Sequence, residues 1–356
     1  REMAKQALSH RRGLVFFGIR LVLFSFLAVL LIGYATYVLT PKNDYGICSM
    51  VNLYRQPEQS VDVLAVGTSM VYAGVNPNVL WADYGIAAYD LCSAEQPFWI
   101  SYYVIREALK TQCPKVILLD AKPAVYTQEY SRRGRTILST FGIRGMENRV
   151  GAILACVEQP SDALDYILGL PQVHSNYETV TWSDFAIPPS NGGRGENWKG
   201  FIEMDVVEHH QRPSMVWTDV KRSMSDKEEQ YARKIFELCQ EKGIQVLLIG
   251  LPNPDYAGDH MYYNALWALA EEYGVAGSNY NDPNLRFGLR YSSDFADWQH
   301  LNVKGSITLS HKLGEDLLER FELPDHRDDP AYESYDLAAQ AWFANLPAFE
   351  SSPKEE

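Results

Sequence analysis

The sequence is poor in cysteine and lacks an excess of positive charge, and each shortage excludes a class of protein. Five scattered cysteines among 356 residues are too few for a disulfide framework, and their odd number leaves at least one free thiol. No Cys-x-x-Cys or Cys/His spacing indicates a zinc site. With 45 acidic and 32 basic residues the net charge is −13, whereas a nucleic-acid-binding surface needs a positive excess. We therefore expect no metal and no nucleic-acid partner.

Other common features are missing as well. The chain contains no Asn-x-Ser/Thr sequon, which disfavours a eukaryotic secretory product, and no internal repeat or long low-complexity tract. Hydrophobic residues make up 46% and charged residues 22%, close to the globular average, which excludes a disordered or fibrous chain. The length suffices for one large domain, or for two modest ones, plus an anchor.

One long apolar run is present near the N-terminus. Residues 21–39 carry no charge, and as a helix they would extend roughly 28 Å, about the thickness of the hydrocarbon core. Residues 1–20 contain five basic side chains and one acidic, so the positive-inside rule predicts a cytoplasmic N-terminus and an extracytoplasmic body. A cleaved signal peptide and a buried core helix are the alternatives. Tyr34, Tyr37 and Leu39 occupy the end where a signal peptide has small residues, which favours an uncleaved anchor.

The body alternates short apolar runs with amphipathic segments. Residues 61–66, 115–119 and 245–249 are rich in Val, Leu and Ile, as buried strands of a parallel sheet are. Residues 97–110 and 225–242 precede two of these runs and have helical patterns, the second with a Ser cap and a Gly stop. This alternation predicts a doubly wound α/β domain.

Residues 55–322 are the expected extent of this domain. An insertion is predicted at 131–224, because the strand near 120 and the strand near 245 are separated by more chain than one βαβ unit needs. Within it we expect helical material at 146–170 and a Gly/Pro-rich loop at 187–200. A last helix is predicted after Gly305, and the acidic tail, 323–356, contains one short helical candidate at 332–346.

Two motifs from opposite ends of the body suggest serine chemistry. Ser69 follows the first predicted strand in Gly-Thr-Ser, where a turn would present its hydroxyl above the carboxyl ends of the strands. A serine needs a base within hydrogen-bond reach, and a histidine held by a carboxylate is the usual one. Asp297 and His300 lie three residues apart, so one turn can deliver both to Ser69. The sequence therefore predicts a Ser69, Asp297 and His300 triad; the alternative is a serine that only caps a helix.

These motifs resemble those of the SGNH or GDSL hydrolases, whose first block is Gly-Asp-Ser or a variant and whose last is Asp-x-x-His. The runs VDVLAVGTS and DWQHLNVKG are most similar to membrane-anchored bacterial members that modify cell-surface polymers, such as the D-alanine transfer protein of teichoic acid and the alginate acetylation proteins. The resemblance covers residues 60–130 and 225–320, with a weaker echo around His174. It implies a three-layer α/β/α sandwich with a parallel, flavodoxin-like sheet, serine acyl chemistry and no cofactor.

The sequence departs from that family at the oxyanion site. The family's Gly-x-Asn-Asp motif, whose asparagine donates to the oxyanion, has no match, because the third strand ends in Asp-Ala-Lys-Pro at 120–123. An oxyanion needs preorganised donors. The candidates are the backbone N–H of Ser69, that of Ser93 or Ala94, and the side-chain amide of Gln96.

Several other polar residues have more than one interpretation. His209 and His210, with Asp205 and Glu208, suggest a metal, yet neighbouring histidines do not share a helix face, which favours a solvated segment. His174 is either a cleft residue or structural. The remaining candidates are Asp120 and Lys122, for substrate contact or a strand-end turn, and Arg132, Arg133 and Arg135, for an anionic polymer, lipid headgroups or a solvated turn.

The sequence thus predicts a single-pass, extracytoplasmic serine esterase or O-acyltransferase that acts on acyl esters of a cell-envelope polysaccharide. Its expected partners are that polysaccharide or its acyl donor, and a membrane-bound O-acyltransferase. One alternative is a catalytically weak module of the same fold that presents the polymer to the membrane-bound acyltransferase. Another is a soluble secreted esterase, should the anchor be cleaved.

Overall fold

The computed structural model describes residues 2–41, 45–186, 198–214 and 217–346. The chain forms two compact units. Residues 1–42 and 159–190 make up the smaller, and residues 43–158 and 191–356 the larger. The segment predicted as an insertion, 131–224, is therefore shared between the two units.

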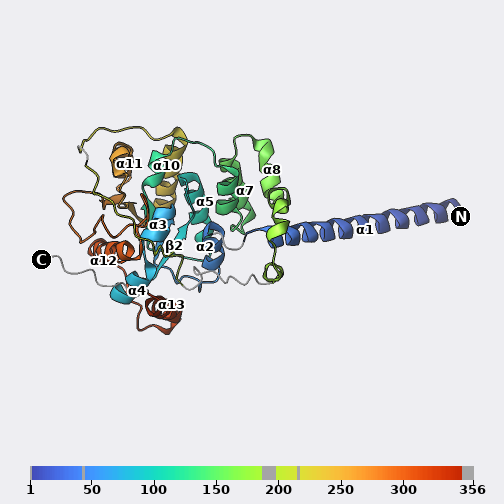
Figure 1. The fold of residues 1–356 in the computed structure, drawn as a ribbon. Coiled ribbons are helices and arrows are strands. Elements are labelled where there is room, and N and C mark those ends of the chain that lie inside the picture. The colour runs from blue at the N-terminus through green and yellow to red at the C-terminus, as the bar shows by residue number, and fades with distance from the viewer. Residues whose placement is uncertain (1, 42–44, 187–197, 215–216, 347–356) are drawn as a thin grey trace. The chain divides into compact units, whose positions relative to one another are not determined.

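The smaller unit contains one long helix, α1 (Glu2–Leu39) (Figure 1). Its segment from Arg12 to Leu39 is long and apolar enough to cross a membrane. The apolar helix expected from the sequence is thus present. Five short helices complete this unit: η2 (Pro160–Asp162), α8 (Ala163–Leu168), α9 (Leu170–Val173), η3 (His174–Thr179) and η4 (Trp182–Phe185). Of these, α9, η3 and η4 pack on α1, and the carbonyl of Leu168 at the end of α8 accepts from Thr36 of α1 at 3.4 Å.

The larger unit contains a five-stranded sheet in which every neighbouring pair is parallel. The strand order is β2-β1-β3-β4-β5, the doubly wound order: β2 lies on one side of β1, whereas β3, β4 and β5 follow on the other, so the order of the strands reverses between β1 and β3. Ligands of such sheets bind beside the carboxyl ends of the strands at this reversal. The strands are β1 (Val63–Gly67), β2 (Ala88–Cys92), β3 (Val116–Asp120), β4 (Gln245–Gly250) and β5 (Ala276–Asn279).

Alternate strand residues join two different hydrophobic clusters. Leu64 and Val66 of β1 belong to a cluster that includes residues of α5 and α10. Val63 and Ala65 belong to another, which includes residues of α3 and α12. Both faces of the sheet are therefore buried, which explains the continuous apolar runs in the sequence. The predicted α/β class with a parallel sheet is confirmed.

The helices predicted at 97–110, at 225–242, after Gly305 and at 332–346 are present as α5, α10, α12 and α13. Ser225 caps α10, its hydroxyl accepting the N–H of Glu228 at 3.2 Å, and Gly243 ends it with φ 69°. The helices are α2 (Tyr45–Leu53), α3 (Ser69–Gly74), α4 (Pro77–Tyr84), α5 (Phe98–Ala108), α6 (Arg133–Thr140), α7 (Met146–Cys156), α10 (Asp226–Lys242), α11 (His260–Glu272), α12 (Val303–Arg320) and α13 (Glu333–Ala344), with short η1 (Lys122–Val125), η5 (Tyr256–Gly258) and η6 (Pro330–Tyr332).

Parts of the predicted insertion and of the acidic tail differ from the sequence expectation or add to it. The predicted helical stretch 146–170 is divided into α7 and α8, which belong to different units. Most of the predicted Gly/Pro-rich loop, 187–197, lies outside the described residues. The tail helix α13 packs on α4, where Trp81 donates to Asp336 at 2.9 Å, so this part of the acidic tail belongs to the larger unit.

Candidate active site

Ser69 stands at the junction of β1 and α3, at the carboxyl end of a central strand. The preceding Thr68 has an extended backbone, and its hydroxyl accepts the N–H of Met70 at 3.2 Å, which caps α3. Ser69 is consequently the first residue of the helix, with no helical partner for its own N–H. Its side chain is half-buried between buried neighbours. The helix-capping alternative for the serine therefore does not apply, because Thr68 is the cap.

Asp297 and His300 lie on a small hairpin before α12. The N–H of Ala296 donates to the carbonyl of His300 at 2.9 Å, and Phe295 bridges to Leu301. Asn302 ties this hairpin to the helix: its Nδ2 donates to the carbonyl of Phe295 at 3.2 Å, while its Oδ1 caps α12. The hairpin is thus fixed on the first turn of a long helix.

The structure brings the three predicted triad residues together across 231 positions of the chain. His300 Nε2 lies 2.7 Å from Ser69 Oγ, and His300 Nδ1 lies 2.8 Å from Oδ2 of Asp297. Burial alone would raise the pKa of Asp297, but hydrogen bonds from the backbone N–H of Gln299 and from the side chain and backbone of His300 hold it below its usual value.

These distances define the direction of proton transfer. An ionised Asp297 can only accept, so it accepts from Nδ1–H of His300 and leaves Nε2 with a free lone pair. Ser69 then donates its hydroxyl proton to Nε2. This is the arrangement in which a neutral histidine acts as a general base toward a serine nucleophile.

Asp120, at the end of β3, holds the segment that carries Ser69. Its Oδ2 accepts from the N–H of Thr68 at 3.0 Å and from the hydroxyl of Thr68 at 2.6 Å, and its Oδ1 accepts the N–H of Lys122 at 2.9 Å. A Cβ on Gly67 would lie 2.2 Å from Cβ of Asp120, so only glycine allows this approach. Burial raises the pKa of Asp120, while the bonds from Thr68 and Lys122 oppose the rise.

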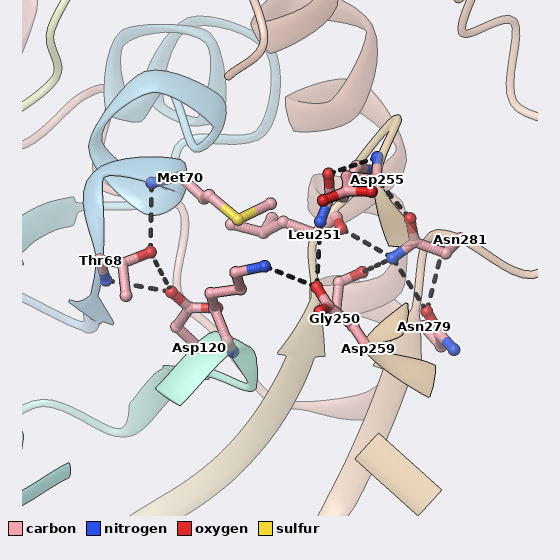
Figure 2. A network of polar contacts seen from close by, with 11 residues as sticks. Thr68, Met70, Asp120, Gly250, Leu251, Asp255, Asp259, Asn279 and Asn281 are labelled. Atoms are coloured by element: carbon pink, nitrogen blue, oxygen red, sulfur yellow. Dashed lines mark hydrogen bonds and ion pairs between the residues drawn. The ribbon is translucent and has the colours of Figure 1, made fainter. Parts of the chain in front are cut away.

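The same polar network continues along the carboxyl ends of the next strands, as Figure 2 shows. Lys122 forms an ion pair of 2.6 Å with Asp259, which also accepts from Asn253 at 3.1 Å. Asn281 donates to the carbonyl of Leu251 at 2.7 Å. Asp120 and Lys122 are therefore engaged in holding strand ends together, as the strand-end interpretation expects. Lys122 also lines a cavity next to Trp298 and Gln299, so its predicted substrate contact stays a prediction.

The predicted oxyanion donors are unequally available. The N–H of Ser93 donates to the carbonyl of Gly67 at 3.3 Å, and its hydroxyl donates to Gln96 at 2.9 Å. The amide of the buried Gln96 donates in turn to Ser101 at 3.2 Å. These two residues close a loop rather than point free donors at a substrate. In the described part of the chain, the half-buried Ala94 has no partner for its N–H.

This loop contains a residue in the left-handed region. Glu95 has φ 54°, and its carboxylate receives two hydrogen bonds of 3.1 Å from Arg135 of α6. The guanidinium therefore fixes the loop that carries Ala94. Arg135, predicted as part of a basic cluster, therefore has a local structural role.

Sequence reasoning missed Tyr72, which contacts the candidate nucleophile. Tyr72 lies one helical turn after Ser69 on α3, close enough for the Ser69 hydroxyl to lower the pKa of its phenol against the larger effect of burial. Burial raises the pKa of Tyr72 to about 12, so the phenol stays protonated at neutral pH. The Ser-x-x-Tyr spacing was the only signal for it.

A cavity of about 360 Å³ opens beside the triad hairpin. Trp298 and Gln299, the residues between Asp297 and His300, form part of its wall. Aromatic and cationic side chains form much of the rest, among them Trp99, Tyr126, Tyr130, Lys122, Arg132 and Arg135. Flat aromatic faces and guanidinium groups suit a polyhydroxylated or anionic ligand. Arg133, the third member of the predicted cluster, does not line it.

The other histidine candidates lie elsewhere. His174 belongs to the smaller unit and its Nδ1 pairs with the carbonyl of Pro171 at 2.9 Å. His209 Nδ1 pairs with the carbonyl of Ser292, and Nε2 of His210 lies 3.6 Å from Oε1 of Glu208. Within the described ranges, no group of three His, Cys, Asp or Glu side chains is placed to hold a metal ion.

Comparison of the chain with protein-family models finds no match, and comparison with curated proteins finds no significant similarity. The interpretation of the site therefore depends on its geometry.

Proposed function

We propose that the larger unit is a serine acyltransferase or esterase domain of the SGNH type, a three-layer α/β/α sandwich, held at the membrane by α1. The observation that carries the proposal is the continuous hydrogen-bonded relay from Ser69 Oγ through His300 to Asp297 at the carboxyl end of β1. The position at the reversal of a doubly wound sheet agrees with it.

The chemistry follows from the relay. As Ser69 Oγ forms a bond to an acyl carbonyl carbon, its proton moves to Nε2 of His300, and Asp297 stabilises the resulting imidazolium. His300 then gives this proton to the leaving alcohol, which departs as the carbon–oxygen bond breaks. A second hydroxyl, from water or from a sugar, then attacks the acyl-serine and gives its proton to Nε2 of His300. As the bond between the acyl carbon and Oγ breaks, His300 passes this proton to Ser69 Oγ, which restores the serine and the neutral histidine. The N–H of Ser69 and of Ala94 and the Tyr72 hydroxyl are the available oxyanion donors.

The substrate we propose is an acyl ester, acetyl or similar, of a cell-envelope polysaccharide. The cavity beside the hairpin of Asp297 and His300 supports it, because its aromatic walls suit sugar rings and its arginines suit acidic groups. The donor is expected to be supplied through a membrane-bound O-acyltransferase. The uncharged span after a basic N-terminal segment supports an extracytoplasmic larger unit.

A catalytically weak polymer-presenting module is the second candidate. The internal engagement of Ser93 and Gln96 favours it, because a site with few free oxyanion donors stabilises a tetrahedral intermediate poorly.

Labelling with a fluorophosphonate distinguishes the two candidates. An activated Ser69 is expected to react, and Ser69→Ala to remain unlabelled with unchanged thermal unfolding. Ser292→Ala, at an exposed serine away from the relay, is the matched control and should label as the wild type does. A folded wild-type chain that stays unlabelled would favour the polymer-presenting module.

The orientation has its own test in Cys113, an exposed thiol of the larger unit. A membrane-impermeant maleimide added to intact cells should label the wild type and not Cys113→Ser. Labelling that appears only after lysis would place the larger unit in the cytoplasm.

A further inference from the structure

The smaller unit contains an aromatic collar, which we define as residues 160–186, around the last turns of α1. Tyr34 donates its hydroxyl to the carbonyl of Phe185 at 3.1 Å, and Tyr37 donates to that of Ala186 at 2.9 Å. Asn176 donates to the carbonyl of Leu39 at 3.1 Å, which satisfies an orphan acceptor at the end of the helix. The collar is thus attached to the end of the apolar span by specific polar contacts.

The collar divides α1 into an open and a covered part. Side chains from Leu14 to Tyr34 are almost all exposed, whereas Ala35 to Leu39 are partly or fully buried. At 1.5 Å per residue the open part is roughly 30 Å long, the thickness of the hydrocarbon core. Arg20 lies roughly 9 Å from the start of this part, within reach of the inner headgroups by snorkelling. The outer end of the lipid-facing stretch therefore falls at Tyr34 rather than at Leu39.

The collar carries large apolar side chains that the unit itself leaves uncovered. Trp182 is 91% exposed and Tyr177 66%, and Phe185 packs 5.8 Å from Trp182 between ring centroids. On α8, Leu164 and Leu168 are both exposed one turn apart. An exposed tryptophan with exposed apolar neighbours indicates a surface that is covered by a lipid membrane or by another protein.

We propose that the aromatic collar lies in the headgroup region of the outer leaflet and binds the lipid surface directly. This inference rests on the proposed membrane span. Its hydrogen bonds place the collar at the end of a stretch of bilayer length, and Trp and Tyr are the side chains that concentrate at this depth. Residues 159–186 contain no Lys or Arg and four acidic residues, so binding depends on aromatic insertion and not on anionic lipid.

The consequence is a second point of attachment beside the helix. A single transmembrane helix can rotate and tilt, whereas aromatic anchors at its end restrict both. The partner is the bilayer that α1 spans; a membrane protein covering the same side chains is the competing occupant and an outcome of the test.

Trp182 is the only tryptophan of the smaller unit among eight in the chain, which allows a direct measurement. The full chain is reconstituted in phosphatidylcholine vesicles whose acyl chains carry bromine either near the headgroup or near the bilayer centre. Bromine near the headgroup should quench up to roughly one-eighth of the emission, and more than bromine at the centre. Trp182→Phe should lose this quenching, whereas Trp298→Phe, which removes another exposed tryptophan, should keep it.

The controls separate the collar from the anchor. The collar inference alone would be overturned if the wild-type chain floats with the vesicles but Trp182→Phe leaves the quenching unchanged. That result would favour a membrane protein as the occupant of the collar surface. Chain that does not float would overturn both the span and the collar. Added phosphatidylglycerol should not increase the quenching, and a marked increase would contradict aromatic insertion as the cause.

Discussion

Asp120, at the carboxyl end of β3, accepts two hydrogen bonds through a single oxygen, Oδ2, from the backbone N–H and the hydroxyl of Thr68, the residue before Ser69. Its other oxygen, Oδ1, accepts the N–H of Lys122. The position of the candidate nucleophile is consequently set by a neighbouring strand as well as by β1. This makes Asp120 a positioning residue, since it acts through Thr68.

Asp120→Asn should therefore slow the labelling of Ser69. An amide has one donor end, so in either orientation it turns that donor toward Thr68 or toward the N–H of Lys122. We expect a loss of about 1–3 kcal/mol of stability and a labelling rate reduced roughly 10- to 100-fold by misplacement of Ser69. Denaturant unfolding and the rate of fluorophosphonate labelling measure the two effects.

Asp316→Asn is the matched control, because Asp316 is also buried and accepts from Tyr280 at 2.8 Å and from Lys312 at 2.7 Å, on α12. It should lose stability without slowing the labelling of folded protein. Equal slowing in both variants would contradict a positioning role for Asp120.

The triad hypothesis predicts a second set of variants. His300→Ala should reduce turnover of an activated acyl ester by roughly 10⁴-fold or more, and Asp297→Asn by a similar or smaller factor as the imidazole loses its orienting charge. His311→Ala, which removes an exposed histidine of α12, should leave turnover unchanged. Wild-type turnover in His300→Ala, measured on folded protein, would disprove the assignment.

Tyr72→Phe removes only the hydroxyl that interacts with Ser69 and keeps the ring, whose centroid lies 5.9 Å from the centroid of the Tyr45 ring. If this hydroxyl stabilises the developing oxyanion, kcat should fall roughly 10²- to 10³-fold with little change in KM. Tyr45→Phe, on the ring beside it, should keep kcat. A change in KM alone, or none, would mean that Tyr72 only packs against the site.

The sequence predicted the elements whose cause is local. Continuous apolar runs identified β1, β3 and β4, because both faces of the sheet are buried, and the Ser225 cap located the start of α10. The strand β5, with the sequence Ala-Gly-Ser-Asn, was not predicted, because an edge strand of small and polar residues has no apolar run to reveal it.

In the candidate site, too, some residues were predicted from a local pattern and others were not. Ser69, Asp297 and His300 were found because each motif is short in sequence and linked to an element boundary. The engagement of Ser93 and Gln96, and the position of Tyr72 beside Ser69, involve residues only three to five positions apart, but they depend on side-chain directions that the sequence pattern does not give. The collar around α1 was missed for a different reason, since residues more than 120 positions apart pack together there.

Lys199 predicts a pH dependence of stability. Burial lowers the pKa of its ammonium from 10.5 to about 7, although Nζ lies 3.7 Å from the Tyr335 ring centroid, a contact that favours the charged form. Between these two values the unfolded chain holds the proton more often than the folded one, so this lysine makes stability rise with pH. Its penalty is complete below about pH 7 and disappears as pH approaches 10.5.

Lys199→Met removes the titrating group while keeping an unbranched side chain. The wild type should gain stability relative to this variant between pH 7 and pH 9 in denaturant unfolding. A constant difference between the two proteins over that interval would show that Lys199 stays charged when buried, held by Gln56, Ser334 and the Tyr335 ring.

The last prediction concerns transfer against hydrolysis. An acyl group on Ser69 is transferred either to water or to a sugar hydroxyl. An acceptor bound in the cavity beside the triad hairpin reacts at a high effective molarity, which favours transfer to the sugar. A hydrolase gains little from attachment to the membrane, whereas a transferase has to remain beside its donor. We therefore expect the full chain in vesicles to hydrolyse simple esters slowly, and deletion of the gene to lower the acyl content of a surface polysaccharide.

The cavity allows the acceptor step to be separated from acylation. Trp298→Ala removes an aromatic wall next to His300, so it should reduce acyl transfer to an added glycan while fluorophosphonate labelling of Ser69 continues at the wild-type rate. Trp217→Ala, at a partly exposed tryptophan that does not line this cavity, should leave both unchanged. Higher surface acylation after gene deletion, together with fast hydrolysis of the isolated polymer, would identify a deacylating esterase, because the acyl-serine would then be released to water.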